Sequence, residues 1–228
     1  MPRIARAVAV GVPHHVTQRG NHRQDVFFTP DDYAVYLHWL AEYATKYQLR
    51  IWACCLMPNH VHLVVTPERE DTLARTMQAV QSRFTQRLNS RLHWHGHLWQ
   101  GRFFSAPLDE YYFWHALRYV ERNPVRAGLV ARAETYPWSS AAAHCGVAPT
   151  NLLAPLPAET LMGADGWSAW LAGAEGEAIL SLRAATSSGR PCGTLAFVEQ
   201  MSSALGRPLQ APQRGRPRKT PLRSDAEE

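Results

Sequence analysis

The sequence predicts an α+β protein, with an antiparallel or mixed β-sheet and helices packed on one of its faces. Two observations support this prediction. Apolar residues change several times between helical spacing and strand-like runs, which gives the element order β-α-β-β-α-β-α. Turn signals containing glycine, proline or asparagine separate these segments. The 46% content of hydrophobic residues is sufficient for a globular core.

The first five elements are predicted by local pattern. Residues 14–19 read as a short strand that ends at Gly20-Asn21. A helix is expected from about Asp31 to Tyr47, because two aspartates precede apolar residues at helical spacing. Two apolar strands, 49–56 and 60–66, follow with Pro58-Asn59 between them, and they are expected to form a hairpin. A second helix is expected to begin near Thr72.

The sequence patterns of the remaining elements are less periodic. An aromatic segment at 98–104 reads as a strand, and a helix at 109–122 should end before Asn123-Pro124, because proline disfavours a helical residue before it. We expect a domain over residues 1–142 and a small helical extension over 143–206. The extension should contain a helix pair at 158–182 and a helix near 194–205. The basic segment 207–228 is expected to be a disordered tail.

Composition and charge exclude several classes of protein. No apolar run approaches the ~20 residues of a membrane span, and no clear signal peptide is present, so we expect a cytoplasmic, nucleoid-associated protein with no membrane partner. The four cysteines form no CxxC pair, which argues against a disulfide scaffold. Net charge is +5, and only Lys46 and Lys219 among the 24 basic residues are lysine. Arginine suits a nucleic-acid partner, although GC-rich codon usage would produce the same bias.

A pair of histidines is the strongest chemical signal. In the stretch MPNHVHLVV, His60 and His62 begin a predicted strand and are two residues apart, so their side chains share one face and could hold one metal ion. A second cluster, at His93, His95 and His97, contains a glycine and reads as a loop. The strand context therefore favours His60 and His62 as the metal pair.

The predicted helix before Pro124 offers a second signal. Tyr119 and Asn123 are four residues apart and could face one site. Spacing alone favours the simpler interpretation, in which Tyr119 packs in the core and Asn123 caps the helix. Tyr111 and Tyr112 are alternative nucleophiles.

Four arginines near the middle of the chain and two in the tail could contact DNA. Arg83, Arg87 and Arg91 recur every four residues along one helical face, and Arg102 follows in the aromatic segment. Such a basic stripe is either a solvated face or a surface that lies along phosphates. Arg214 and Arg216 lie in RGRPRK (214–219), which resembles an AT-hook, a motif that enters the minor groove of DNA.

The motif MPNHVHLVV resembles the HUH motif of single-tyrosine transposases, and more closely that of REP-associated tyrosine transposases. Four other stretches match in order: HHVTQRGN (14–21), GHLWQGRFFS (96–105), YVERNPVRAGLV (119–130) and YPWSS (136–140). The resemblance covers about residues 1–142. It implies a ferredoxin- or RRM-like HUH fold, Tyr119 as the nucleophile and His60 and His62 as metal ligands. Asn123 stands where related transposases often have glutamine as a third ligand.

The resemblance implies a metal-dependent nickase and strand transferase. Its substrate would be single-stranded, hairpin-forming DNA, its metal Mg²⁺ or Mn²⁺, and its intermediate a 5′-phosphotyrosine. One alternative is a non-catalytic relative on the same fold that recognises repeated palindromic elements. Another is a structural zinc-binding domain. The oligomeric state, monomer or dimer, stays open.

Overall fold

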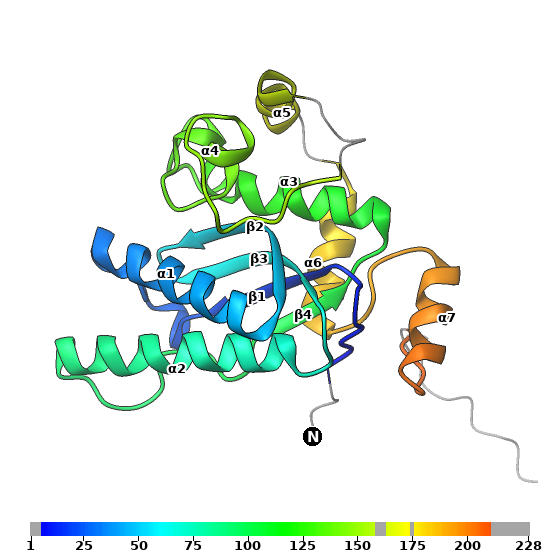
Figure 1. Ribbon diagram of the computed structural model, residues 1–228, viewed down its shortest axis with the longest axis horizontal. Coiled ribbons are helices and arrows are strands. Elements are labelled where there is room, and N and C mark those ends of the chain that lie inside the picture. The colour runs from blue at the N-terminus through cyan, green and yellow to red at the C-terminus, as the bar shows by residue number, and fades with distance from the viewer. Residues whose placement is uncertain (1–5, 158–162, 174–175, 211–228) are drawn as a thin grey trace, which may run out of the picture.

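A computed structural model describes residues 6–157, 163–173 and 176–210. Its centre is a four-stranded sheet in the order β2-β3-β1-β4, in which every neighbouring pair is antiparallel (Figure 1). The strands are β1 (His14–Arg19), β2 (Leu49–Met57), β3 (His60–Pro67) and β4 (Phe104–Pro107). The predicted α+β class with an antiparallel sheet is therefore confirmed, as is the hairpin of β2 and β3.

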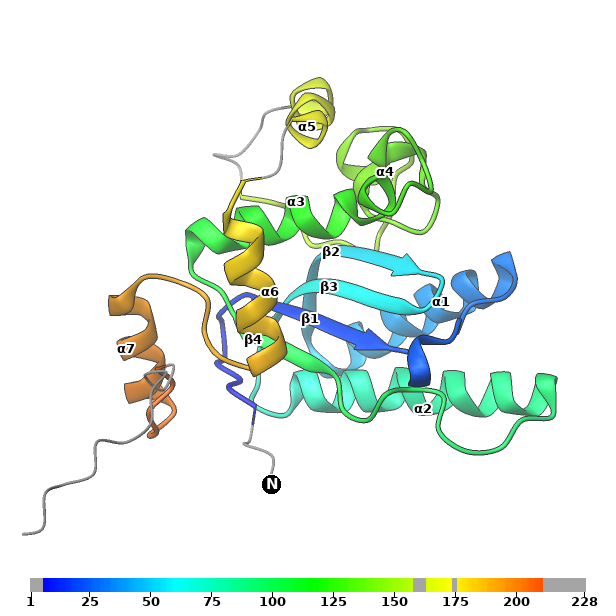
Figure 2. The ribbon, with the colours of Figure 1, turned by 180° about the vertical axis from the view of Figure 1, so that it is seen from behind.

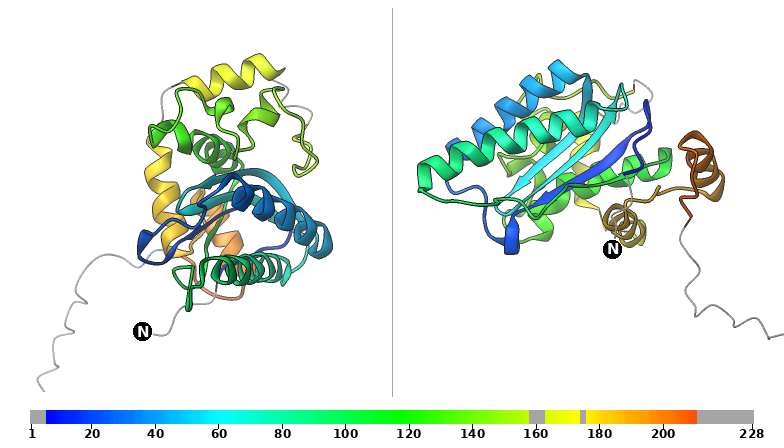
Figure 3. Two further views of the ribbon diagram at one scale, coloured as in Figure 1. Left: turned by 90° about the vertical axis from the view of Figure 1, so that its left-hand side faces the viewer. Right: turned by 90° about the horizontal axis from the view of Figure 1, so that it is seen from below.

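Two long helices cover one face of the sheet. Figure 3 (right) looks onto this face, with α1 (Pro30–Tyr47) and α2 (Thr72–Leu92) in front of the strands. Their apolar sides enclose fully buried Leu40 and Phe84 together with the odd-numbered positions of β3, such as Leu63. Pro30 at the first helical position and two aspartates in the first turn favour the start of α1.

The opposite face carries α3 (Glu110–Arg126), so the expectation of helices on one face holds only for α1 and α2 (Figure 1). The helix passes through Pro124, contrary to the predicted end at residue 122. Proline removes the N–H that would bind the Val120 carbonyl. The Asn123 side chain compensates, because its Nδ2 donates to the carbonyls of Tyr119 (2.9 Å) and Val120 (3.5 Å).

The strand expected at 98–104 is also wrong, because β4 begins only at Phe104. Gly101 has a φ of 65°, which interrupts an extended backbone. The aromatic residues before it pack as a loop: Trp99 is buried and forms one isolated bridge with Gly20. Hydrophobicity in this segment reflects core packing and not strand pairing.

The helical extension packs on α3 and on the β4 edge. Besides the short α4 (Ala141–His144), it contains α5 (Gly163–Ala172), α6 (Ala178–Ser188) and α7 (Leu195–Ala204). Trp167 of α5 and Leu182 of α6 join the buried cluster of α3. Buried Glu121 of α3 accepts hydrogen bonds from Ser140, His144 and Trp167. Figure 2 shows α6 beside β4.

The remaining points concern two short turns, the lengths of the helices and the C-terminal segment. Single 3₁₀ turns occur at Asn21–Arg23 and Ala133–Thr135. Among the described helices none is long and apolar enough to cross a membrane. Most of the segment predicted to be a disordered tail lies outside the described residues, which end at residue 210.

Candidate active site

Strand β3 places His60 and His62 on the sheet face that is covered by α3. Alternate residues of a strand point to the same face, so both histidines lie opposite to Val61 and Leu63, which pack under α1 and α2. The centroids of the two imidazole rings are 4.9 Å apart. His62 is 5% exposed and His60 is partly buried. The structure thus brings these two predicted site residues together.

Helix α3 brings Tyr119 to the same place. Its ring centroid lies 5.5 Å from that of His62, with the rings nearly perpendicular, and its side chain is buried. The alternative tyrosines lie further back on the helix, where Tyr111 is 59% exposed and contacts the His115 ring at 4.4 Å. Tyr119 alone of the three contacts a histidine of β3.

His15 of β1 is a site residue that the sequence analysis missed. Its ring stacks on His62 with the centroids 5.3 Å apart, and its Nε2 lies 3.0 Å from Nδ1 of His62. Strand β1 pairs directly with β3, with Thr17 opposite to His62. The available signal was the alternation within HHVTQR, which puts His15 on the same face as Thr17 and Arg19.

We assign the proton on each ring from its hydrogen-bond partners. The Thr186 hydroxyl of α6 donates to the Leu182 carbonyl (2.8 Å), so its oxygen accepts from Nδ1–H of His15 (2.8 Å). Nε2 of His15 then has no proton and accepts from Nδ1–H of His62. Consequently Nε2 of His62 carries a free lone pair.

Nε2 of His60 also carries a free lone pair, because a different partner accepts the proton on Nδ1. Its Nδ1–H donates to Oδ1 of Asn59 (2.6 Å), and the Asn59 amide is oriented because its Nδ2 donates to the Arg23 carbonyl (2.9 Å). Burial, with Arg19 and Arg126 nearby, lowers the pKa of His60 to about 3. Burial and the neighbouring His15 hold the pKa of His62 well below its usual value.

These two neutral imidazoles fit a divalent metal ion. Metal-bound histidine is neutral and commonly donates its second ring N–H to an oriented acceptor, as both do here. Among the described residues no group of three or more His, Cys, Asp and Glu side chains is arranged to hold a metal. The pair would therefore need further ligands. The closed zinc centre considered above is not formed by the described side chains, since it requires four such ligands.

Two arginines and Asn123 complete the surroundings of Tyr119. Nη2 of Arg126 lies 3.5 Å from the Tyr119 hydroxyl and 2.6 Å from Oδ1 of Asn123. Asn123 is fully buried, with its amide nitrogen bonded to its own helix. Arg19 is paired in register with His60. Burial lowers the pKa of Arg19, and the neighbouring Arg23 adds to this effect. The site therefore combines positive charge with neutral imidazoles, an arrangement that suits an anionic phosphodiester.

The predicted basic stripe is not brought to this site. Each of its arginines forms an ion pair with a carboxylate of α1: Arg83 with Glu42, Arg87 with Asp31, and Arg91 with Asp32. These pairs join the two helices on the face opposite to His62. The histidines at 93, 95 and 97 lie in an exposed loop after α2. Arg102 is exposed near the β4 edge, and Arg214 and Arg216 lie outside the described residues.

Comparisons with known proteins agree with this geometry. Residues 10–123 match the family model Y1_Tnp, described as "Transposase IS200 like". A Haemophilus influenzae protein assigned by name to the REP-associated tyrosine transposases is 29% identical over 105 residues, which cover 41% of this chain and 60% of that relative. The fold resembles a REP-associated tyrosine transposase structure, bound to a REP hairpin, with a TM-score of 0.55 and 19% identity. That match covers 69% of this chain and all of the other.

The family model spans half of the chain and includes β1, the histidine pair and Tyr119. The resemblance inferred from the motifs is confirmed. The chain belongs to the IS200-like transposase family, whose members cleave and rejoin DNA.

Proposed function

We propose that this protein is a nickase and strand transferase for single-stranded, hairpin-forming DNA, with Tyr119 as the nucleophile. The observation that carries the proposal is the approach of the Tyr119 ring to within 5.5 Å of His62, on the sheet face that also carries His60. Similarity to a protein bound to a REP hairpin supports a hairpin substrate. The family supports a cytoplasmic location near the nucleoid.

The chain's own groups account for the attack and for charge stabilisation. The Tyr119 hydroxyl releases its proton to solvent as its oxygen forms a bond to phosphorus. The bond from phosphorus to O3′ breaks, and the leaving oxygen takes up one proton from solvent to give a free 3′-hydroxyl. The product is a 5′-phosphotyrosine, which keeps the energy of the phosphodiester for rejoining. Arg126, 3.5 Å from the Tyr119 hydroxyl, stabilises negative charge on the attacking oxygen and on the phosphate.

Nε2 of His60 and Nε2 of His62 would hold the metal, which we propose to be Mg²⁺ or Mn²⁺. When bound, such an ion acts as a Lewis acid on a phosphate oxygen. The substrate's own oxygens and water would complete the ligand shell. Asn123 could contribute as a third ligand only if its bond to Arg126, 2.6 Å long, opened.

Replacement of Tyr119 by phenylalanine tests the proposal. The substrate is a single-stranded, hairpin-forming oligonucleotide, incubated with Mn²⁺ and analysed on a denaturing gel. The wild-type protein should form a covalent adduct, Tyr119→Phe should form none, and Tyr111→Phe should behave as wild type. Binding without metal should be nearly equal for all three proteins.

Two results would contradict this assignment. An adduct with Tyr119→Phe would show that another residue is the nucleophile. Hairpin binding by the wild-type protein without any adduct would favour the alternative, a non-catalytic relative that only recognises the DNA.

A further inference from the structure

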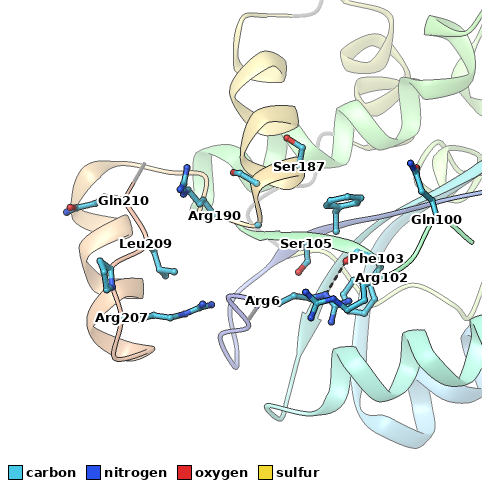
Figure 4. A pocket seen from close by; sticks show the side chains of 14 residues that line it. Arg6, Gln100, Arg102, Phe103, Ser105, Ser187, Arg190, Arg207, Leu209 and Gln210 are labelled. Carbon is cyan, nitrogen blue, oxygen red and sulfur yellow. Dashed lines mark hydrogen bonds between the residues drawn. The ribbon is translucent and has the colours of Figure 1, made fainter. Parts of the chain in front are cut away.

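A cavity of about 510 Å³ lies at the free edge of β4, away from Tyr119. It is formed by the N-terminal segment and β4 on one side and by the residues that follow α6 and α7 on the other (Figure 4). The cavity therefore lies between the transposase domain and the helical extension. Its size is within the range of small-ligand pockets.

The charged side chains that line this cavity, among the described residues, are all positive. Its lining includes Arg6, Arg102, Arg190 and Arg207, and none of the described residues that line it is an aspartate or a glutamate. In Figure 4, Arg207 extends from the extension toward Arg6 and Arg102. No ion pair with a described carboxylate is formed by Arg6, Arg102 or Arg190, unlike the paired arginines of α2. Guanidinium groups gathered in this way repel one another unless an anion lies between them.

Two further observations support an anionic ligand here. Arg6 stacks on the Phe103 ring at 3.6 Å and donates to the Phe103 carbonyl (3.1 Å), which fixes its guanidinium group at the cavity wall. Burial and the charge of Arg102 lower the pKa of Arg6 to about 10. Ser105, a residue that is 1% exposed, also lines the cavity, and its hydroxyl is buried without a hydrogen-bond partner among the described residues.

The cavity also contains an exposed aromatic ring that is aligned with the active site. Phe104 is 45% exposed. In the sheet register Phe104 pairs with Thr17, and Thr17 pairs with His62. Directly opposed residues of antiparallel strands point to the same face, so Phe104 lies on the face of His62, about 10 Å away across two strand spacings.

We propose that this cavity is a subsite for single-stranded DNA beside the cleavage site, with phosphates on its arginines and a base stacked on Phe104. Binding of single strands typically combines a basic groove with aromatic platforms. The subsite rests on the proposed function, since it places the strand that would enter the Tyr119 site. It also gives the extension a role, because Arg190 and Arg207 come from residues after α6 and α7.

Equilibrium binding at several salt concentrations tests the subsite. The probe is a fluorescein-labelled oligothymidylate of about 15 nucleotides. The full chain carries Tyr119→Phe, and EDTA is present, so neither the nucleophile nor the metal contributes. Added to this background are Arg102→Gln, Arg190→Gln, Phe104→Leu, Phe104→Tyr and, as the matched control, Arg83→Gln.

Arg102→Gln and Arg190→Gln should each make the slope of log K against log salt shallower, by about 0.7 for each phosphate that the variant no longer neutralises. Phe104→Leu should weaken binding roughly 5- to 100-fold at an unchanged slope, and Phe104→Tyr should restore it. Arg83→Gln should match the background, because Glu42 already neutralises Arg83 on the other face.

Slopes equal to that of the Tyr119→Phe background for Arg102→Gln and Arg190→Gln, or an equal reduction by Arg83→Gln, would overturn the proposal. Equal affinity for a duplex of the same length would also overturn it. Because the assay excludes metal and nucleophile, these outcomes are independent of the covalent adduct that tests the proposed function.

Discussion

The hydroxyl of Thr186 determines the proton position on His62 through His15, and its removal should weaken metal binding. The perturbation is Thr186→Val, which keeps the branched shape of this 3%-exposed side chain but removes the oxygen that accepts Nδ1–H of His15. His15 then loses the bond that fixes its proton on Nδ1. The proton of His15 can then lie on Nδ1 or on Nε2. Because Nε2 of His15 is hydrogen-bonded to Nδ1 of His62, the proton of His62 can then also lie on either nitrogen.

The magnitude follows from the buried hydrogen bond. A buried donor that loses its partner costs about 1–3 kcal/mol, which corresponds to roughly 5- to 150-fold in an equilibrium constant. Loss of a hydrogen-bonding partner of a metal-bound histidine typically weakens metal binding 10- to 100-fold. We therefore expect Mn²⁺ affinity to fall within roughly that range in Thr186→Val. Thr186→Ser keeps the hydroxyl and is the matched control.

Two measurements separate this effect from general destabilisation. Nitrogen-15 NMR of the metal-free protein reports whether Nδ1 or Nε2 of His62 is protonated, and calorimetry with Mn²⁺ reports affinity. Wild type and Thr186→Ser should show a single His62 tautomer with the proton on Nδ1. A single unchanged tautomer in Thr186→Val, with wild-type Mn²⁺ affinity, would refute the reasoning, and so would an equal loss in Thr186→Ser.

Two further predictions follow from the site and the core. His62→Ala should abolish the covalent DNA adduct, whereas His97→Ala, in the exposed loop, should retain it; equal loss on the denaturing gel would show that the loop participates. Asp32→Asn should lower the free energy of unfolding by about 1–3 kcal/mol at pH 7, measured with urea, because buried Asp32 accepts from Arg91 and from the Thr29 N–H. Burial by itself would raise the pKa of Asp32, but these bonds hold it below its usual value, so its stabilisation is present at neutral pH and should be lost on acidification. Equal stability of the two proteins at pH 7 would contradict this account.

Local pattern alone was sufficient for most elements and for placing His60 and His62 on one face of a strand. Apolar periodicity predicted α1, α2 and the β2–β3 hairpin, because each buries one face and its spacing follows from its own geometry. His60 and His62 share a face for the same local reason, since alternate residues of any strand do so. The errors occurred where packing overrides propensity: α3 continues through Pro124, and residues 98–103 form a loop.

The tertiary structure decided how these parts meet. Residue spacing left Tyr111, Tyr112 and Tyr119 open as nucleophiles, and the motif resemblance implied Tyr119. Only the packing of α3 on the sheet brings Tyr119 to His62. The strand order places His15 next to His62, and it aligns Phe104 with Thr17 and His62 across the sheet. Spacing along the chain does not predict either relation. The sequence shows no ion-pair partner close to the α2 arginines along the chain, but in the structure each pairs with a carboxylate of α1. Such relations depend on contacts between residues far apart in the chain, so they are fixed only when the whole core packs.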